Sequence, residues 1–191
     1  MSAQQGCFVA VVGPSGAGKD TILSAARAKL AHDPRFVFAR RVVTRPNDRH
    51  EDNDSISAAD FAEAEARGAF LLAWHAHGQS YGLQASLSQP LADGCCVIAN
   101  VSRLVVPDIR ARFARSVIVE IRVDAAVLAM RLSERGREDE IEQKARLVRT
   151  QSLGGDLQPD VVIDNNHHID EAIAAFMGVL VRLPVDSVTP P

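Results

Sequence analysis

Residues 13–21 read GPSGAGKDT and directly follow the apolar run FVAVV at residues 8–12. A helical pattern begins near Asp20, so the segment joins a predicted buried strand to a predicted helix. Glycines let successive backbone N–H groups turn toward an anion, and the helix N-terminus adds partial positive charge. Lys19 supplies a mobile cation for the β- and γ-phosphates of a nucleotide. We therefore interpret the segment as a phosphate-binding loop, to which Gly13, Pro14, Ser15, Gly16, Ala17, Gly18, Lys19, Asp20 and Thr21 contribute.

The loop departs from the pattern G-x-x-x-x-G-K-[ST] at its last position, where Asp20 replaces the hydroxyl residue that normally ligates magnesium. Thr21 cannot take over that role, since one residue along a helix turns the side chain by about 100°. Mg²⁺ takes oxygen ligands and keeps much of its water shell, so a carboxylate can hold it directly or through water. Asp20 is therefore the predicted magnesium contact.

Apolar runs of strand length alternate with amphipathic helical patterns along the rest of the chain. This alternation predicts an α/β fold with a mostly parallel central sheet and helices on both faces. The predicted strands are 8–12, 37–43, 70–74, 95–101, 116–123 and 161–164, and the predicted helices are 20–30, 58–67, 104–113, 124–135, 138–153 and 169–183. Residues 1–183 are predicted to form one domain and 184–191 a frayed, proline-rich tail.

Composition and charge exclude several classes of protein. With 21 Lys+Arg against 24 Asp+Glu, the chain has no global positive field, and we do not expect a nucleic-acid partner. The longest apolar stretch, residues 7–12, is far too short to cross a membrane, and no secretion signal is evident. The spacing of the three cysteines fits neither a disulfide framework nor a zinc site. We expect a cytoplasmic protein, either a monomer or a homodimer.

Several segments resemble the guanylate kinase family, one of the P-loop nucleoside monophosphate kinase-like folds. GPSGAGK matches the phosphate-binding loop of that family, TRP at 44–46 its acceptor-phosphate segment, and HGQSYG at 77–82 its HGNxYG motif. RLSERG at 131–136 resembles its lid, and VVIDNN at 161–166 resembles its terminal strand and adenine-side loop. The resemblance implies a three-layer fold with a small acceptor-binding insertion at about 36–83 and an arginine-rich lid at about 131–149.

The positions that read guanine in that family are different here. Leu72 stands in place of a glutamate, Leu83 in place of a hydroxyl residue, and Asn100 in place of the aspartate of an IDVQG strand end. Leucine cannot pair the N–H donors of guanine, and an unpaired buried donor costs about 1–3 kcal/mol. We therefore do not expect guanosine monophosphate to be the acceptor.

GKD in the loop, RRVVTRP at 40–46 and the WHAHGxxYG-type run at 74–82 are similar to the ribose 1,5-bisphosphate phosphokinase family, over the full length of the chain. That resemblance implies in-line phosphoryl transfer from ATP, with Mg²⁺, to a sugar phosphate, in phosphonate degradation. Guanidinium groups match phosphate oxygens in bidentate fashion and can neutralise charge that develops between donor and acceptor. On this basis the catalytic candidates are Lys19, Arg135, Arg137 and Arg146, the additional ATP contacts are Arg131 and Asn165, and the acceptor contacts are Arg41, Arg45, Arg49, His77 and Tyr81.

Structural alternatives remain for several of these residues. The arginine-dense stretch 131–149 also fits a solvated helix pair with salt bridges. Arg41 could equally be a surface charge at a strand edge, and Asn165 could cap a loop. For Tyr81, the alternative to acceptor binding is a packing role in the core. At the level of function, the alternatives are a guanylate kinase or other nucleoside monophosphate kinase, and a catalytically inactive guanylate kinase-like binding module.

Overall fold

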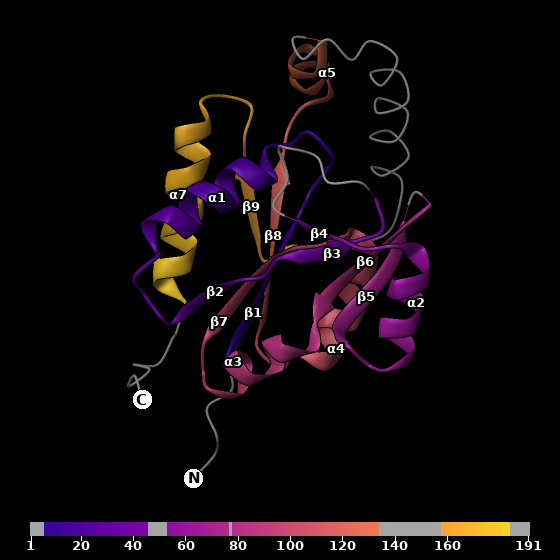
Figure 1. Cartoon of the computed structure of the whole chain (residues 1–191). Helices are drawn as coiled ribbons and strands as arrows, with labels where there is room; N and C mark the ends of the chain where they lie inside the picture. The colour runs from indigo at the N-terminus through magenta and orange to yellow at the C-terminus, as the bar shows by residue number, and fades with distance from the viewer. Residues whose placement is uncertain (1–5, 46–52, 77, 134–157, 184–191) are drawn as a thin grey trace.

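The computed structural model describes residues 6–45, 53–76, 78–133 and 158–183. Its central sheet has five parallel strands in the order β2 (Phe36–Phe38), β7 (Cys96–Asn100), β1 (Cys7–Val12), β8 (Ser116–Arg122) and β9 (Val161–Asp164) (Figure 1). Nearly every residue of the three middle strands is buried, as expected of a parallel sheet covered on both faces. The predicted α/β class is therefore confirmed.

The two faces of this sheet bury different side chains of the same strands. Val9 and Val11 of β1 face α1 (Lys19–Lys29) and α7 (Ile169–Arg182), which lie side by side on one face (Figure 1). Phe8, Ala10 and Val12 face the opposite side, which α4 (Val106–Arg112) and a second sheet cover. This period of two along β1 places the end of the strand between two layers of packed structure.

The second sheet is small and mostly antiparallel. Its order is β4 (Asn53–Ser55), β3 (Arg41–Val43), β6 (Gln79–Gln84) and β5 (Phe70–Ala76), with β3 and β4 parallel to each other. Two strand predictions need correction here. The run 37–43 is divided between β2 and β3, which belong to different sheets, and the run 70–74 lies in the second sheet rather than the central one.

The second sheet has an inner and an outer face. Leu72, Trp74 and Leu83 point inward and pack in one cluster with Phe8, Ala10 and Val12 of the central sheet. On the outer face lies α2 (Ala58–Ala66), whose Phe61 stacks on Phe70 with ring centroids 4.6 Å apart. The side chains that point inward near the end of β1 are therefore the ones that can meet the phosphate-binding loop.

The remaining elements follow from local sequence signals. Ser57 caps α2 by accepting a 3.0 Å hydrogen bond from the Asp60 N–H, as S-x-x-D predicts. The predicted helix 104–113 begins with a 3-10 turn, Arg103–Val105, that leads into α4, and the predicted helix 124–135 corresponds to α5 (Ala125–Ser133). The short helix α3 (Ser88–Ala92) was not predicted. The predicted helix 138–153 and tail 184–191 lie outside the described residues.

None of the helices described by the structure is long and apolar enough to cross a bilayer.

Candidate active site

The phosphate-binding loop has the predicted strand, loop and helix arrangement. β1 ends at Val12 and α1 begins at Lys19. Gly13 and Gly18 adopt φ angles of +148° and +87°, a region that side chains other than glycine disfavour. A Cβ atom at Gly13 would collide with the carbonyl oxygen of Ile121 on the neighbouring strand β8. The loop geometry therefore depends on these glycines.

Lys19 lies over the first residues of the loop. Its Nζ donates to the carbonyl oxygen of Gly13 at 2.9 Å and to that of Pro14 at 2.8 Å. Both bonds hold the ammonium above the loop at the end of β1. This is the position from which a lysine can reach the terminal phosphates of a nucleotide bound by the loop.

Asn165, directly after β9, supports the loop from beneath. Its amide Nδ2 donates to the carbonyl oxygen of Ala17 at 2.8 Å, and the residue is only 1% exposed. A Cβ atom at Gly18 would lie 2.6 Å from the same nitrogen, so the glycine leaves the space that the amide fills. The structure thus gives Asn165 a role in holding the loop, while its predicted contact with ATP stays a prediction.

Asp20 connects the loop to both sheets. Its Oδ1 accepts a 2.8 Å hydrogen bond from Asn100 Nδ2 at the end of β7, and Arg41 Nη2 on β3 lies 3.7 Å away. Arg41 Nε in turn donates to Oδ1 of Asn53 at 3.1 Å, and Asn53 is almost fully buried. Arg41 therefore lies at the junction of the two sheets, with a side chain only 14% exposed. It is not the exposed strand-edge charge considered above.

Magnesium would find oxygen ligands at this junction. The Asp20 side chain is 44% exposed, so its carboxylate is accessible at the exit of the loop. One carboxylate together with phosphate oxygens and water is a donor set that suits Mg²⁺. In the parts of the chain that the structure describes, no three His, Cys, Asp or Glu side chains form a metal-binding cluster. Asp20 is thus a fitting but isolated protein ligand.

Tyr81 lies on the inner face of the second sheet. It pairs with Val43 across β3 and with Trp74 across β5, and its ring stacks on that of Trp74 at 5.4 Å and 8°. The Tyr81 ring is partly buried against the inner cluster and partly exposed. It is therefore both a packing residue and a hydroxyl donor on the predicted acceptor side.

The TRP segment is held next to Tyr81 by hydrogen bonds between strands. The Thr44 hydroxyl accepts from the Ser80 N–H at 2.9 Å, and the Thr44 N–H donates to the Ser80 carbonyl at 3.1 Å. Ser55 Oγ donates to the carbonyl oxygen of Arg45 at 2.7 Å. These bonds fix the backbone of Thr44 and Arg45 at the end of β3, close to the inner face.

Gly82 and His75, on the neighbouring strands β6 and β5, have structural partners on the outer face. A Cβ atom at Gly82 would lie 2.6 Å from the Phe70 ring, so this glycine makes room for packing on the outer face rather than for a ligand. His75 lies opposite Ser80, with its Nδ1 2.9 Å from the Ser80 hydroxyl and its Nε2 3.6 Å from Glu65 of α2. His75 thus faces away from the loop.

The side chains at the positions where the guanylate kinase pattern fails have structural partners. Leu72 and Leu83 pair with each other across β5 and β6 and are 1% and 0% exposed. Both pack in the inner cluster. Asn100 uses its amide on Asp20. The groups that would pair guanine are therefore replaced by core packing and by a bond to the loop.

Arg131 of α5 donates from Nη2 to the carbonyl oxygen of His167, which ties the start of the predicted lid to the loop after β9. The other predicted site residues of this region and of the acceptor side, Arg49, His77, Arg135, Arg137 and Arg146, lie outside the described residues.

One cluster of charged residues beside the loop was missed in the sequence. Glu120 of β8 is 6% exposed, and its two carboxylate oxygens accept from Arg103 Nη2 at 2.8 Å and Arg122 Nη2 at 2.7 Å. The signal was present, because a glutamate interrupts the apolar run VIVEI at residues 117–121 of β8. A buried carboxylate requires a partner, so a glutamate at this position already indicates a cation beside it in the fold.

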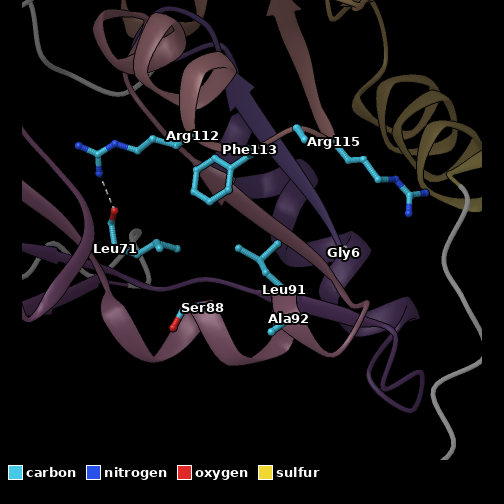
Figure 2. Close-up of a pocket in the computed structure, with 9 residues that line it drawn as sticks. Gly6, Leu71, Ser88, Leu91, Ala92, Arg112, Phe113 and Arg115 are labelled. Carbon is cyan, nitrogen blue, oxygen red and sulfur yellow. Dashed lines mark hydrogen bonds between the residues drawn. The ribbon is translucent and has the colours of Figure 1, made fainter. Parts of the chain in front are cut away.

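A cavity of about 240 Å³ lies at the opposite end of the central sheet (Figure 2). It is lined by Gly6, at the start of β1, together with Leu71, Leu91 and Phe113. Arg112 crosses its edge and donates to the Leu71 carbonyl oxygen at 3.1 Å. None of the predicted site residues lines this cavity, and the candidate active site remains the loop at the other end of β1.

Comparisons with known proteins bear on the family and the fold of the chain. No protein-family model matches the chain. The chain is 46% identical over 185 residues to a ribose 1,5-bisphosphate phosphokinase PhnN of Brucella melitensis, covering 96% of each. It is 47% identical over 175 residues to the protein of the same name from Methylobacterium radiotolerans, covering 92% of this chain and 97% of that protein.

Among solved structures, a guanylate kinase from Anaplasma phagocytophilum matches with a TM-score of 0.71 and covers 98% of this chain and 91% of its own. At 16% sequence identity this match shows a guanylate kinase-like fold. The guanylate kinase-like fold that the sequence predicted is thus confirmed. With near-complete coverage by relatives above 40% identity, the chain belongs to the ribose 1,5-bisphosphate phosphokinase family.

Proposed function

We propose that this protein transfers the γ-phosphoryl group of ATP to the 1-phosphate of ribose 1,5-bisphosphate, giving 5-phosphoribosyl 1-diphosphate and ADP. The observation that carries the proposal is full-length similarity to relatives named for action on this sugar phosphate. The phosphate-binding loop with Lys19 supports phosphoryl transfer, and the buried Leu72 and Leu83 support an acceptor other than guanosine monophosphate. We place the reaction in phosphonate degradation, in the cytoplasm.

The chemistry requires positioning rather than proton removal. The acceptor phosphate is already ionised at neutral pH, so no general base is needed, and catalysis rests on alignment and charge stabilisation. The backbone N–H groups of the loop bind the donor phosphates, and Lys19 turns its ammonium from the Gly13 and Pro14 carbonyls to the β- and γ-phosphates. Asp20 would hold Mg²⁺, which supplies charge neutralisation to the bound phosphates.

On the acceptor side, we assign Arg41, Arg45 and Tyr81 to binding, together with Arg49 and His77. Tyr81 lies on the inner face and can donate its hydroxyl to a phosphate oxygen. Arg41 lies 3.7 Å from Asp20, so it would link acceptor binding to the loop. Arg135, Arg137 and Arg146 are proposed to neutralise charge on the transferred group, and Arg131 and Asn165 to support the bound ATP.

The test is ADP release from Mg-ATP with ribose 1,5-bisphosphate, run beside guanosine monophosphate and the Lys19→Ala variant. We expect turnover with the sugar bisphosphate, none with the nucleotide, and a loss of at least a hundredfold in Lys19→Ala, about the effect of removing one transition-state donor. Turnover with guanosine monophosphate alone would instead identify an atypical guanylate kinase. ATP binding without turnover on any acceptor would identify an inactive binding module.

A further inference from the structure

A buried carboxylate holds two arginines at the carboxyl end of the central sheet, where the phosphate-binding loop begins. Glu120 of β8 pairs with Val12 of β1, and Val12 directly precedes Gly13, the first residue of the loop. It is 6% exposed, and each of its oxygens accepts from a different guanidinium, Arg103 at 2.8 Å and Arg122 at 2.7 Å. The three side chains together carry one excess positive charge.

The side of the sheet on which this cluster lies follows from strand alternation. Ile118, two residues before Glu120, belongs to the inner cluster that includes Trp74 and Leu83 of the second sheet. Val119 and Ile121 belong to the opposite cluster, against α1 and α7. Glu120 therefore points to the face on which the second sheet packs, which is the side of Tyr81 and the TRP segment.

Arg103 reaches Glu120 by passing over the end of β1. The residue follows β7, Glu120 is on β8, and β1 lies between these two strands in the sheet. A 2.8 Å contact between the two side chains thus places the Arg103 guanidinium across the carboxyl end of β1. Lys19 Nζ is bonded to the Gly13 and Pro14 carbonyls at that same end. The Arg103 side chain is 25% exposed there.

Glu120 fixes the orientation of this guanidinium. A carboxylate hydrogen bond at 2.8 Å is charge-assisted and directional, and a nearly buried acceptor makes it stronger than a surface pair. Arg122, which is 56% exposed, occupies the second oxygen, so the carboxylate cannot swing to another partner without losing a bond. An arginine held in this way presents its planar donors in one orientation, as bidentate phosphate binding requires.

We propose that Arg103 binds the reacting phosphate of the acceptor beside the phosphate-binding loop, and that Glu120 is the positioning residue that orients it. The inference rests on the proposed function, because it needs a phosphate-bearing acceptor between the loop and the second sheet. The acceptor contacts already assigned within the described residues lie on or beside the second sheet, and Arg103 would supply a further cation from the side of the central sheet. Through Glu120 this arginine is held at the end of β1, where the phosphate-binding loop begins and where the phosphoryl group would pass from donor to acceptor.

The experiment compares steady-state kinetics of Arg103→Gln and Arg103→Lys with the wild-type protein, varying ribose 1,5-bisphosphate and ATP in turn. For Arg103→Gln we expect kcat/KM for the acceptor to fall by about tenfold to a hundredfold, the equivalent of one charge-assisted hydrogen bond. Part of that fall should be in kcat, because the contact involves the reacting group. The KM for ATP should change less than threefold, and Arg103→Lys should recover part of the loss.

The matched control is Arg110→Gln. Arg110 also pairs with a carboxylate, that of Asp160, at 3.0 Å. Asp160 directly precedes β9, so this pair lies at the amino end of the parallel strands, whereas the loop lies at their carboxyl end. We expect this variant to keep the wild-type kcat/KM for both substrates. Thermal unfolding of each variant separates loss of folded protein from loss of binding.

Glu120→Gln and the double variant with Arg103→Gln test the positioning role. Glu120→Gln should lower kcat/KM for the acceptor, and adding it to Arg103→Gln should cause little further loss, because both changes remove the same contact. Losses that multiply in the double variant would show that Glu120 does not act through Arg103.

Inhibition by ribose 1-phosphate, which carries only the reacting phosphate, identifies the group that Arg103 binds. Its inhibition constant should rise in Arg103→Gln by about the same factor as the KM for the bisphosphate. A rise in that KM with kcat and ribose 1-phosphate inhibition both unchanged would assign Arg103 to the other phosphate and overturn the proposal. So would an effect confined to ATP, or one no larger than that of Arg110→Gln. Failure of the wild-type protein to phosphorylate ribose 1,5-bisphosphate would instead refute the proposed function, and the inference with it.

Discussion

The Asn100 amide donates a 2.8 Å hydrogen bond to the Asp20 carboxylate, which joins the end of β7 to the first turn of α1 across eighty positions of sequence. These two residues are also two departures from the guanylate kinase pattern, which has a hydroxyl at the loop position and an aspartate at the strand end. The two departures are physically coupled. A carboxylate at both positions would bring like charges within hydrogen-bond distance, so a carboxylate at 20 requires a donor at 100.

We predict that Asn100→Asp destabilises the protein and that Asp20→Asn rescues it. The single variant replaces a hydrogen bond by repulsion between two carboxylates, and the free energy of unfolding should fall by about 1–3 kcal/mol. In the double variant Asp20→Asn/Asn100→Asp, the amide and the carboxylate exchange places and the bond can form again. Denaturant unfolding of the four proteins measures the coupling. Additive losses in the double variant would contradict it.

The same Asp20→Asn variant tests the predicted magnesium contact. An amide keeps the size of the side chain but removes the charge that makes a carboxylate oxygen a good ligand for Mg²⁺. We expect the Mg²⁺ concentration needed for half-maximal activity to rise severalfold, and we expect the Asp20→Asn/Asn100→Asp protein to share this defect although its stability is restored. An unchanged Mg²⁺ dependence would exclude Asp20 as a ligand.

Asn165 should matter through the loop that it holds. In Asn165→Ala the Ala17 carbonyl loses its amide donor in a buried place, and we expect a loss of about 1–3 kcal/mol in the free energy of unfolding together with a higher KM for ATP. Asn165→Asp should be worse, since a buried carboxylate would face the Ala17 carbonyl oxygen.

The neighbouring Asn166→Ala is the control for this pair of variants. Asn166 accepts from the Asp124 N–H at 2.7 Å and donates to the Asp164 carboxylate at 2.9 Å, so its removal should leave the KM for ATP close to that of the wild-type protein. Equal effects of the two alanine variants on that KM would argue against a specific role for Asn165.

The central sheet could be predicted because its strands are continuous apolar runs, whereas the second sheet could not. β4 has the sequence NDS, which contains no apolar residue, and in β6, QSYGLQ, only Tyr81 and Leu83 mark a period of two. The run 37–43 looks like one strand, but the chain changes sheets between Phe38 and Arg41. Such strands are specified by their partners in the sheet, and partner choice is not a local property of sequence.

The loop residues could be predicted because their signals are local in sequence, whereas their partners in the fold could not be, because they depend on strand order. Glycine spacing, Lys19 and the flanking strand and helix are all local, and the structure has them as expected. Arg41 beside Asp20, and Arg103 on Glu120, depend on which strands are neighbours. Sequence spacing of 21 and 17 residues gives no sign that these side chains meet.

We predict that the three cysteines are unreactive in the folded protein. Cys7, Cys95 and Cys96 are free and buried. Burial raises the pKa of the Cys95 thiol, and the hydrogen bond to Cys7, with burial, raises that of Cys96. Since the thiolate is the reactive form, a raised pKa leaves little of it at Cys95 and Cys96 at pH 8. The hydrogen bond from Cys96 lowers the pKa of the Cys7 thiol, so Cys7 is protected by its burial, with 4% of the residue exposed. Titration with a thiol reagent should be slow before unfolding and complete, with three thiols, after it. Rapid modification of one thiol would be inconsistent with this packing.

Two glycine substitutions should change stability in opposite directions. Gly82→Ala would bring a methyl group within 2.6–2.9 Å of the Phe70 ring, which cannot retreat because it stacks on Phe61. Overpacking of this kind typically costs about 1–3 kcal/mol. Gly178 lies inside α7, and a Cβ atom there would meet nothing within 4 Å. Gly178→Ala should therefore stabilise the protein by about 0.5–1 kcal/mol.

Both variants replace glycine by alanine, so comparing them separates the contribution of side-chain packing to the free energy of unfolding from that of backbone entropy. Thermal or urea unfolding should place the midpoint of Gly82→Ala below that of the wild-type protein and the midpoint of Gly178→Ala above it. The KM for ATP should stay unchanged in Gly178→Ala, since Gly178 is nine residues along α7 from Ile169, whose side chain lies beside Gly18 of the loop. If Gly82→Ala is as stable as the wild-type protein, Phe70 is free to move, and the outer face of the second sheet is less rigidly packed than its stacked rings indicate.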